Sequence, residues 1–383
     1  MNRYSKYELI LARHSTLTIS VAWGIVSIVL YGMYGFNYTL EAEKYILQAD
    51  YVLTHYSFEE ARFLYYATTI VLICISKLLT GHVALAVLLL LVINWYAYLK
   101  LYKALLFYYN NAFTALGVVL ALLLFVPYQS WTMYLYTESI FYSIIILLIA
   151  KLIRITTLSN VHILVLATYT ILLILSRPLG ILFIPGIGIY MLLKANAKQR
   201  IALGVLGVAS IVGFYAVSQV IFTSTPDWQV QRSFLEENLI CDVPTVASQA
   251  KLNLIQSSSQ LEVLLYYITH NFAHFIGLAG RRLLLFGGLT RSYYSTLHNV
   301  ALLVYILPLY IIIIIGVRHW WHKLPMPLVI CFLVTIVLFA ASVAVQCDDY
   351  HNRFYLSILP MLVILAGTVL HYTISKYYAG TIK

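Results

Sequence analysis

The feature that most constrains this chain is a series of long apolar runs separated by short polar breaks. Runs such as VLALLLFVPYQSW and ILPLYIIIIIGV recur along its length, and we interpret them as segments that cross about 30 Å of hydrocarbon. Because lipid offers backbone groups no hydrogen-bond partner, such segments must be helices. Of the 383 residues, 62% are hydrophobic and only 10% are charged, which excludes a water-soluble globule of this size. The sequence predicts an all-α, polytopic membrane protein.

We expect ten transmembrane helices, at about residues 15–36, 82–102, 112–128, 136–153, 160–176, 178–194, 201–222, 297–317, 326–346 and 355–375. The segment 61–80 is apolar enough to span. If it did, every later helix would reverse, so we expect an interfacial or re-entrant helix there.

The charges follow this topology. The net charge of +10 does not indicate a nucleic-acid partner, because the basic residues punctuate apolar segments and do not gather on one solvated face. With both termini in the cytoplasm, most Lys and Arg residues fall on the cytoplasmic side, as the positive-inside rule expects. Among the 14 carboxylates only Glu8 joins them. The chain is therefore predicted to be multi-pass in the cytoplasmic (inner) membrane, with an acidic extracytoplasmic face.

Two long loops lie on that acidic face of a single domain, residues 1–383. In the first, residues 37–81, apolar positions from Tyr45 to Leu53 recur at helical spacing and predict an amphipathic helix along the membrane. In the second loop, residues 223–296, the sequence predicts a small lid with a further amphipathic helix. Cys241 and Cys347 both fall outside the spans on this face, and the sequence leaves open whether they form a disulfide.

The expected spans carry no Asp or Glu at their middle, so the titratable groups lie at the water interface. The acidic ones include Glu41, Glu43, Glu138, Asp348 and Asp349, and the basic ones are Arg177, Arg281, Arg282, Arg291 and Arg353. Arginine binds phosphate through a planar fork, and a carboxylate can accept a proton from a hydroxyl. This combination at a membrane surface suits a lipid-linked phosphate substrate.

Several motifs, in order along the chain, resemble the GT-C superfamily of integral membrane glycosyltransferases. EAEKYILQA places Glu41, Tyr45 and Ala49 on that family's pattern after the first span. TESIFYSIIILL, SRPLGILFIP and DDYHNRFYLSILPML are similar to later elements of the family and contribute Glu138, Arg177, Asp349 and Arg353. VLLYYITHNFAHFIGLAGRRLLLFGG resembles its lid helix. The family acid is usually Asp, so the catalytic base stays open between Glu41 and Glu43.

The resemblance implies transfer, with inversion, of a hexosyl or pentosyl group, in a mannosyltransferase-like manner. The donor would be a polyprenyl-phosphate sugar, and the acceptor a glycan, lipid or protein of the cell envelope. Glu41 or Glu43 would be the base, the donor phosphate would bind Arg177, Arg281, Arg282 and Arg353, and Tyr45, Glu138, Asp349 and Arg291 would support the site. No metal and no obligatory cofactor are expected, and the other partners would be membrane lipids.

Other interpretations of the same residues remain. Glu41 and Glu43 fit a solvated helix face, and Glu138 fits a helix cap. Arg177 fits an interfacial anchor, and Arg281 and Arg282 fit lipid-headgroup binding. A flippase of lipid-linked saccharide, or a non-catalytic member of the same family, is the alternative function.

Overall fold

The computed structural model describes residues 6–205, 207–208, 230–241, 243, 251–255, 257 and 259–380, and within these the regular elements are helices. Six of the described helices are long and apolar enough to cross a membrane, or seven if a bent pair counts as one span. They are Arg13–Tyr34, Ala61–Thr80, Ala84–Tyr109, Thr296–Ile315, Met326–Val345 and Tyr350–Ser375, and the bent pair is Ala112–Leu123 with Val126–Met133. The chain is thus a polytopic α-helical membrane protein.

The helices occupy nearly all the predicted spans, although several are too short to pass as spans by length. They are α1 (Lys6–Tyr34), α2 (Glu41–His55), α3 (Ala67–Thr80), α4 (Ala84–Tyr109), α5 (Ala112–Leu123), α6 (Val126–Gln129), α7 (Thr137–Arg154), α8 (Asn160–Ile174), α9 (Phe183–Lys194), α11 (Val230–Leu235), α12 (Gln260–His270), α13 (Phe272–Gly288), α14 (Thr296–Ile315), α15 (Val317–Lys323), α16 (Met326–Val345) and α17 (Arg353–Gly380). Short 3₁₀ turns are η1 (Ala61–Tyr66), η2 (Ser130–Met133), η3 (Pro178–Leu182) and η5 (Tyr350–Asn352). Most of the predicted span 201–222 lies outside the described residues.

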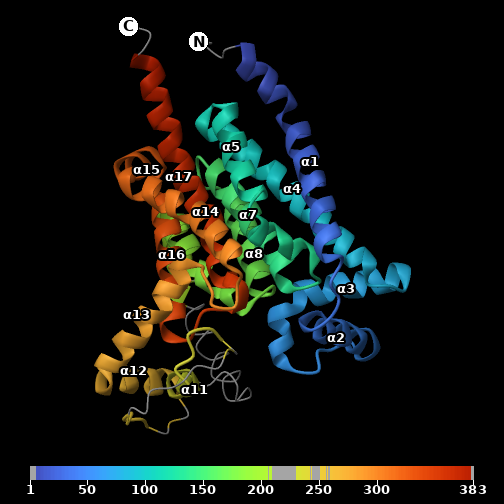
Figure 1. Ribbon diagram of the computed structural model, residues 1–383, viewed down its shortest axis with the longest axis vertical. Coiled ribbons are helices and arrows are strands. Elements are labelled where there is room, and N and C mark those ends of the chain that lie inside the picture. Colours follow the sequence, from blue (N-terminus) through green and yellow to red (C-terminus); the bar gives the residue numbers. More distant parts are fainter. Residues whose placement is uncertain are drawn as a thin grey trace.

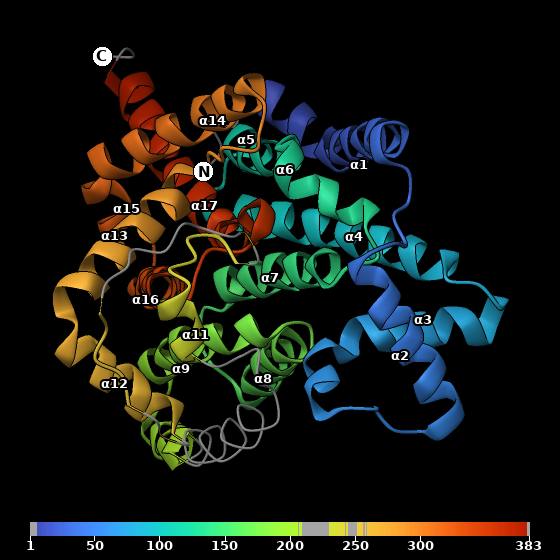
Figure 2. The same ribbon diagram turned by 60° about the horizontal axis from the view of Figure 1, so that its bottom comes forward.

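Helix α7 forms the centre of the bundle. Nearly all of its residues are buried, and Figure 2 shows it between α4 on one side and α8 and α9 on the other. A buried polar chain joins it to its neighbours: Asn94 of α4 donates to Ser143 of α7 at 3.3 Å and accepts from Gln129 of α6 at 2.8 Å. Because buried amides are costly unless paired, this network fixes how these helices pack.

The bend between α5 and α6 brings the first loop to the start of α7. The two helices meet at 67°, with Pro127 in the first turn of α6 and Phe125 extended before it. After η2 the backbone pairs with the first loop: Asn37 N–H donates to the Met133 carbonyl at 2.9 Å, and Leu135 N–H donates to the Asn37 carbonyl at 3.0 Å. These bonds hold α2 close to the amino-terminal end of α7.

The amphipathic helix predicted in the first loop is confirmed as α2, which buries Tyr45 and Ala49. Helix α3 lies along it in the same direction. The Cys74 thiol donates to the Ala49 carbonyl at 3.6 Å, and Lys77 contacts Asp50 at 2.5 Å. The segment predicted to be interfacial is long and apolar enough to span a membrane. It packs alongside α2.

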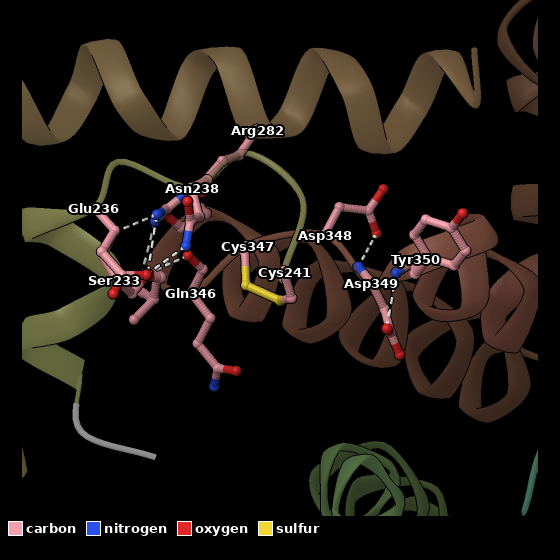
Figure 3. The surroundings of a disulfide bond; sticks show 12 residues. Ser233, Glu236, Asn238, Cys241, Arg282, Gln346, Cys347, Asp348, Asp349 and Tyr350 are labelled. Carbon is pink, nitrogen blue, oxygen red and sulfur yellow. Dashed lines mark hydrogen bonds between the residues drawn. A yellow bond between two sulfur atoms is a disulfide. The ribbon is translucent and has the colours of Figure 1, made fainter. Parts of the chain in front are cut away.

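The described part of the lid is tied to the loop between α16 and α17 by the Cys241–Cys347 disulfide, whose Cα atoms are 5.4 Å apart (Figure 3). Backbone bonds flank it: Cys241 N–H donates to the Asp348 carbonyl at 2.8 Å, and Asp348 N–H donates to the Leu239 carbonyl at 2.9 Å. Helices α2, α11 and α12 lie at one end of the molecule, opposite both termini (Figure 1).

Candidate functional site

Five charged side chains from four parts of the chain meet at the end of the molecule where α2 begins. We call them the charge cluster: Glu41 opens α2, Glu138 lies in the first turn of α7, Arg177 precedes η3, Asp349 precedes η5, and Arg353 opens α17. Each lies in the first turn of an element or directly before one, so residues far apart in sequence meet at one end of the bundle.

Arg353 bridges the two glutamates. Its Nη1 lies 2.6 Å from Glu41 Oε2 and 3.0 Å from Glu138 Oε1. The guanidinium also lies over two aromatic rings, 4.7 Å from the centroid of Trp131 and 5.7 Å from that of Tyr136. Cation–π contact and two carboxylates together fix its orientation.

Arg177 joins Glu138 to Asp349. It forms an ion pair with Glu138, and its Nη2 donates to Asp349 Oδ2 at 2.9 Å. Burial alone would lower its pKa, but the charges of Glu138 and Asp349 raise the pKa of this guanidinium above its ordinary value. Arg177 is therefore a permanent cation held between two anions.

A close turn positions Arg177. Gly180 lies so near Leu173 that a Cβ there would collide with the Leu173 carbonyl. The chain can consequently fold from α8 directly into η3, with Pro178 in the first turn. The glycine and proline of the SRPLGILFIP motif thus have a local role in presenting the arginine.

Glu41 is the most accessible carboxylate of the cluster, with 23% of its side chain exposed against 0% for Glu138. Its Oε1 accepts from the Tyr45 hydroxyl at 2.9 Å and from Lys44 Nζ at 3.0 Å. Burial raises its pKa, but the charges of Arg353, Lys44 and Arg177 outweigh burial and lower the pKa to about 2. Glu41 is thus ionised and pre-aligned, but in this arrangement it is a poor proton acceptor.

The structure separates the two candidates for the base. Glu43 is exposed on α2 and takes part in none of the contacts of the charge cluster. Tyr45, by contrast, is fully buried under Glu41. Burial, and next the charge of Glu41, raise the pKa of Tyr45 well above its ordinary value, so its hydroxyl remains a donor.

The three lid arginines that were predicted to bind phosphate or support the site, Arg281, Arg282 and Arg291, lie outside the charge cluster. Arg282 is fully buried, and its Nε and Nη groups donate to the carbonyls of Asn238, Ala344, Val345 and Ser233 and to the Ser233 hydroxyl (Figure 3). Arg291 forms a buried ion pair with Asp348, and Arg281 contacts Glu237 at 3.2 Å. The structure therefore brings Arg177 and Arg353 together. Arg282 and Arg291 instead connect the lid to residues at and after the end of α16, and Arg281 pairs with Glu237 within the lid.

Sequence reasoning missed four contributors to the site. Lys44 contacts Glu41, Trp131 and Tyr136 face Arg353, and the Tyr142 hydroxyl donates to the Arg353 carbonyl at 3.0 Å. The signals were present: Lys44 lies three residues after Glu41 on a helix. The aromatic run WTMYLY stands directly before TESIF.

The charge cluster offers a carboxylate open to solvent beside two arginines, which fits proton removal next to a phosphate. Within the residues described, no three His, Cys, Asp or Glu side chains are grouped to hold a metal ion. No family model, curated protein sequence or solved structure gives a significant match to the chain.

Proposed function

We propose that this protein is a GT-C-type membrane glycosyltransferase that moves a sugar from a polyprenyl-phosphate donor to an extracytoplasmic glycan, lipid or protein acceptor. The observation that carries the proposal is the direct contact between Glu41 and Arg353. It brings a proton acceptor and a phosphate-binding cation together from residues 312 apart in sequence.

In the proposed reaction the acceptor hydroxyl attacks the anomeric carbon of the donor sugar from the face opposite the phosphate. Its proton passes to Glu41, the new C–O bond forms, and the bond from the anomeric carbon to the phosphate oxygen breaks. Polyprenyl phosphate leaves with the electron pair, next to Arg353 and Arg177. A charge that develops beside fixed cations is stabilised more strongly there than in water.

The depressed pKa of Glu41 gives donor binding a second role. Arg353 has the largest effect among the charges that lower this pKa, and it is also the cation nearest to the Glu41 carboxylate. A donor phosphate that pairs with Arg353 neutralises this charge and adds a negative one close to Glu41. Both effects raise the pKa of Glu41, so it becomes an effective base only once the donor is bound.

The proposed topology has ten spans, both termini in the cytoplasm and the charge cluster outside. Two observations support it. The Cys241–Cys347 disulfide lies beside Asp348 and Asp349, and disulfides persist in oxidising compartments. Helix α3 packs along α2 through the Cys74–Ala49 and Lys77–Asp50 contacts, and an interfacial α3 keeps later helices in the orientation that the basic loops require.

The test is transfer by purified protein from a panel of polyprenyl-phosphate sugars, with a chelator present. We expect release of polyprenyl phosphate that falls about 10²–10⁴-fold in Glu41→Gln. The matched control, Glu43→Gln, lies two positions away on the same helix and should retain activity. Equal activity in wild type and Glu41→Gln would remove Glu41 as the base.

A non-catalytic member of the same family is the second candidate, because both arginines of the charge cluster are already paired with carboxylates. In that case wild type and Glu41→Gln would release no polyprenyl phosphate with any donor. A flippase would likewise show no release, but it would move labelled lipid-linked sugar between the leaflets of proteoliposomes.

A further inference from the structure

Beside the charge cluster lies a group of aromatic side chains that the proposed reaction does not use. We call Tyr293, Tyr294, Tyr350 and His351 the aromatic shelf. Tyr293 stacks on Tyr350 with ring centroids 5.1 Å apart, and Tyr294 stacks on His351 at 5.7 Å. The two pairs touch, since the rings of Tyr293 and Tyr294 are 4.9 Å apart.

The shelf is built by two segments far apart in sequence, the turn before α14 and the η5 turn before α17. The Tyr294 hydroxyl and His351 Nδ1 lie 3.0 Å apart, and Asn352 Nδ2 donates to the Leu289 carbonyl at 2.9 Å. His351 and Asn352 both adopt left-handed backbone conformations, with φ of 58° and 61°. Such conformations persist where surrounding contacts hold them, and they cluster at binding sites.

The side chains of the shelf are held in place by contacts with one another, yet they remain partly exposed to solvent. Tyr293 is 39% exposed and Tyr350 40% exposed, so one side of the stacked pair faces solvent. Asn352, which follows His351 in sequence, is 2% exposed, and its Oδ1 has no hydrogen-bond partner among the described residues. A buried acceptor without a partner is costly, and an ordered water would satisfy it.

The shelf connects directly to the charge cluster. The ring centroids of His351 and Trp131 are 6.3 Å apart, and Trp131 lies under the Arg353 guanidinium at 4.7 Å. Asp349, which pairs with Arg177, immediately precedes Tyr350. A molecule bound on the shelf would therefore lie next to the ring that contacts Arg353.

We propose that the aromatic shelf binds a saccharide and is the acceptor site of the enzyme. The assignment of acceptor rests on the proposed function, whereas saccharide binding does not. A sugar ring has an apolar C–H face that packs on an aromatic ring and hydroxyls around its edge that need hydrogen bonds. The shelf supplies both, through Tyr and His rings with polar tips and no aliphatic member, next to charged groups that an acyl chain would avoid.

Saccharide binding is measured without donor, on protein reconstituted in nanodiscs, by saturation-transfer NMR with methyl α-glucoside, α-galactoside, α-mannoside and α-arabinofuranoside. We expect saturation of at least one glycoside, weakened about tenfold in Tyr293→Ala and in Tyr350→Ala. Tyr266→Ala is the matched control, because Tyr266 stacks on His270 of α12, with ring centroids 3.8 Å apart, outside the shelf. It should bind like wild type.

The result separates the shelf from the transfer reaction. Loss of saturation in the two shelf variants alone supports the shelf, even if no donor is turned over. Three results would overturn saccharide binding by the shelf, even if polyprenyl phosphate is released. Saturation would be equal in all variants, or equal to that of empty nanodiscs, or absent for every glycoside. If the protein both binds saccharide and transfers sugar, Tyr293→Ala and Tyr350→Ala should raise KM for the acceptor about tenfold and leave KM for the donor unchanged.

Discussion

Glu41 and Asp348 are two carboxylates at the same end of the molecule whose pKa values are shifted in opposite directions. Burial raises the pKa of Asp348 to about 6 despite its partner Arg291, whereas three cations lower the pKa of Glu41 to about 2. The difference follows from burial: the Asp348 side chain is 0% exposed, and Glu41 keeps contact with solvent. Asp348 therefore belongs to the structural frame and Glu41 to the open face.

The pKa of Glu41 has a consequence for stability. Its ordinary value is 4.5 and its folded value is about 2, so the ionised form stabilises the folded state above pH 4.5, and this contribution is lost as the pH falls from 4.5 through 2. The full contribution corresponds to about 3 kcal/mol. Thermal unfolding in detergent should show a loss in this window that is smaller in Glu41→Gln. Parallel curves for the two proteins would contradict the prediction.

Arg291 is expected to matter for folding. In Arg291→Met, Asp348 stays buried without its cation, which should cost about 3–5 kcal/mol of unfolding free energy. Arg62→Met is the matched control, since Arg62 pairs with Glu60 at 2.9 Å on the exposed surface, where such pairs contribute below about 1 kcal/mol. Equal denaturation midpoints for the two variants would show that the buried pair does not hold the lid.

At the scale of elements, the sequence predicted most of the segments that form helices. Glu41, Glu138, Arg177, Asp349 and Arg353 were each predicted from a local pattern, and they do meet. No local pattern shows which charged residues contact one another in the fold. Arg282 lies next to Arg281 in sequence, for example, but it is enclosed by carbonyls from α11 and α16. The 67° bend after α5 and the Cys241–Cys347 pairing likewise depend on long-range contacts.

We expect the Cys241–Cys347 disulfide to be the main covalent cross-link between the lid and the rest of the protein. It closes a separation of 106 residues, and loops near 100 residues gain up to about 4–5 kcal/mol from such a link. Cys241→Ser with Cys347→Ser should lower the unfolding midpoint and increase protease cleavage within 230–241. Cys74 and Cys331 are free thiols, so reductant should reproduce the effect in wild type and leave the double variant unchanged.

At the scale of the whole molecule, the arrangement predicts which residues share a membrane face. Single cysteines at Glu43, Asp50 and Lys77 should react with a membrane-impermeant maleimide added from outside intact cells, since α2 and α3 lie together. A cysteine at Lys100 should react only after the membrane is opened. Reaction of Lys77→Cys and Asp50→Cys from opposite sides would show that α3 crosses the membrane.

The separation of 312 residues between Glu41 and Arg353 in the sequence also affects how the protein is made. Glu138, with 0% of its side chain exposed, enters the bundle on α7, but one of its two cations arrives only with α17, the last helix. During synthesis the nascent chain therefore carries an incompletely compensated carboxylate until its carboxyl-terminal segment is inserted. Chains that lack α17 would present this defect to membrane quality control, because Glu138 would keep only Arg177 as a cation.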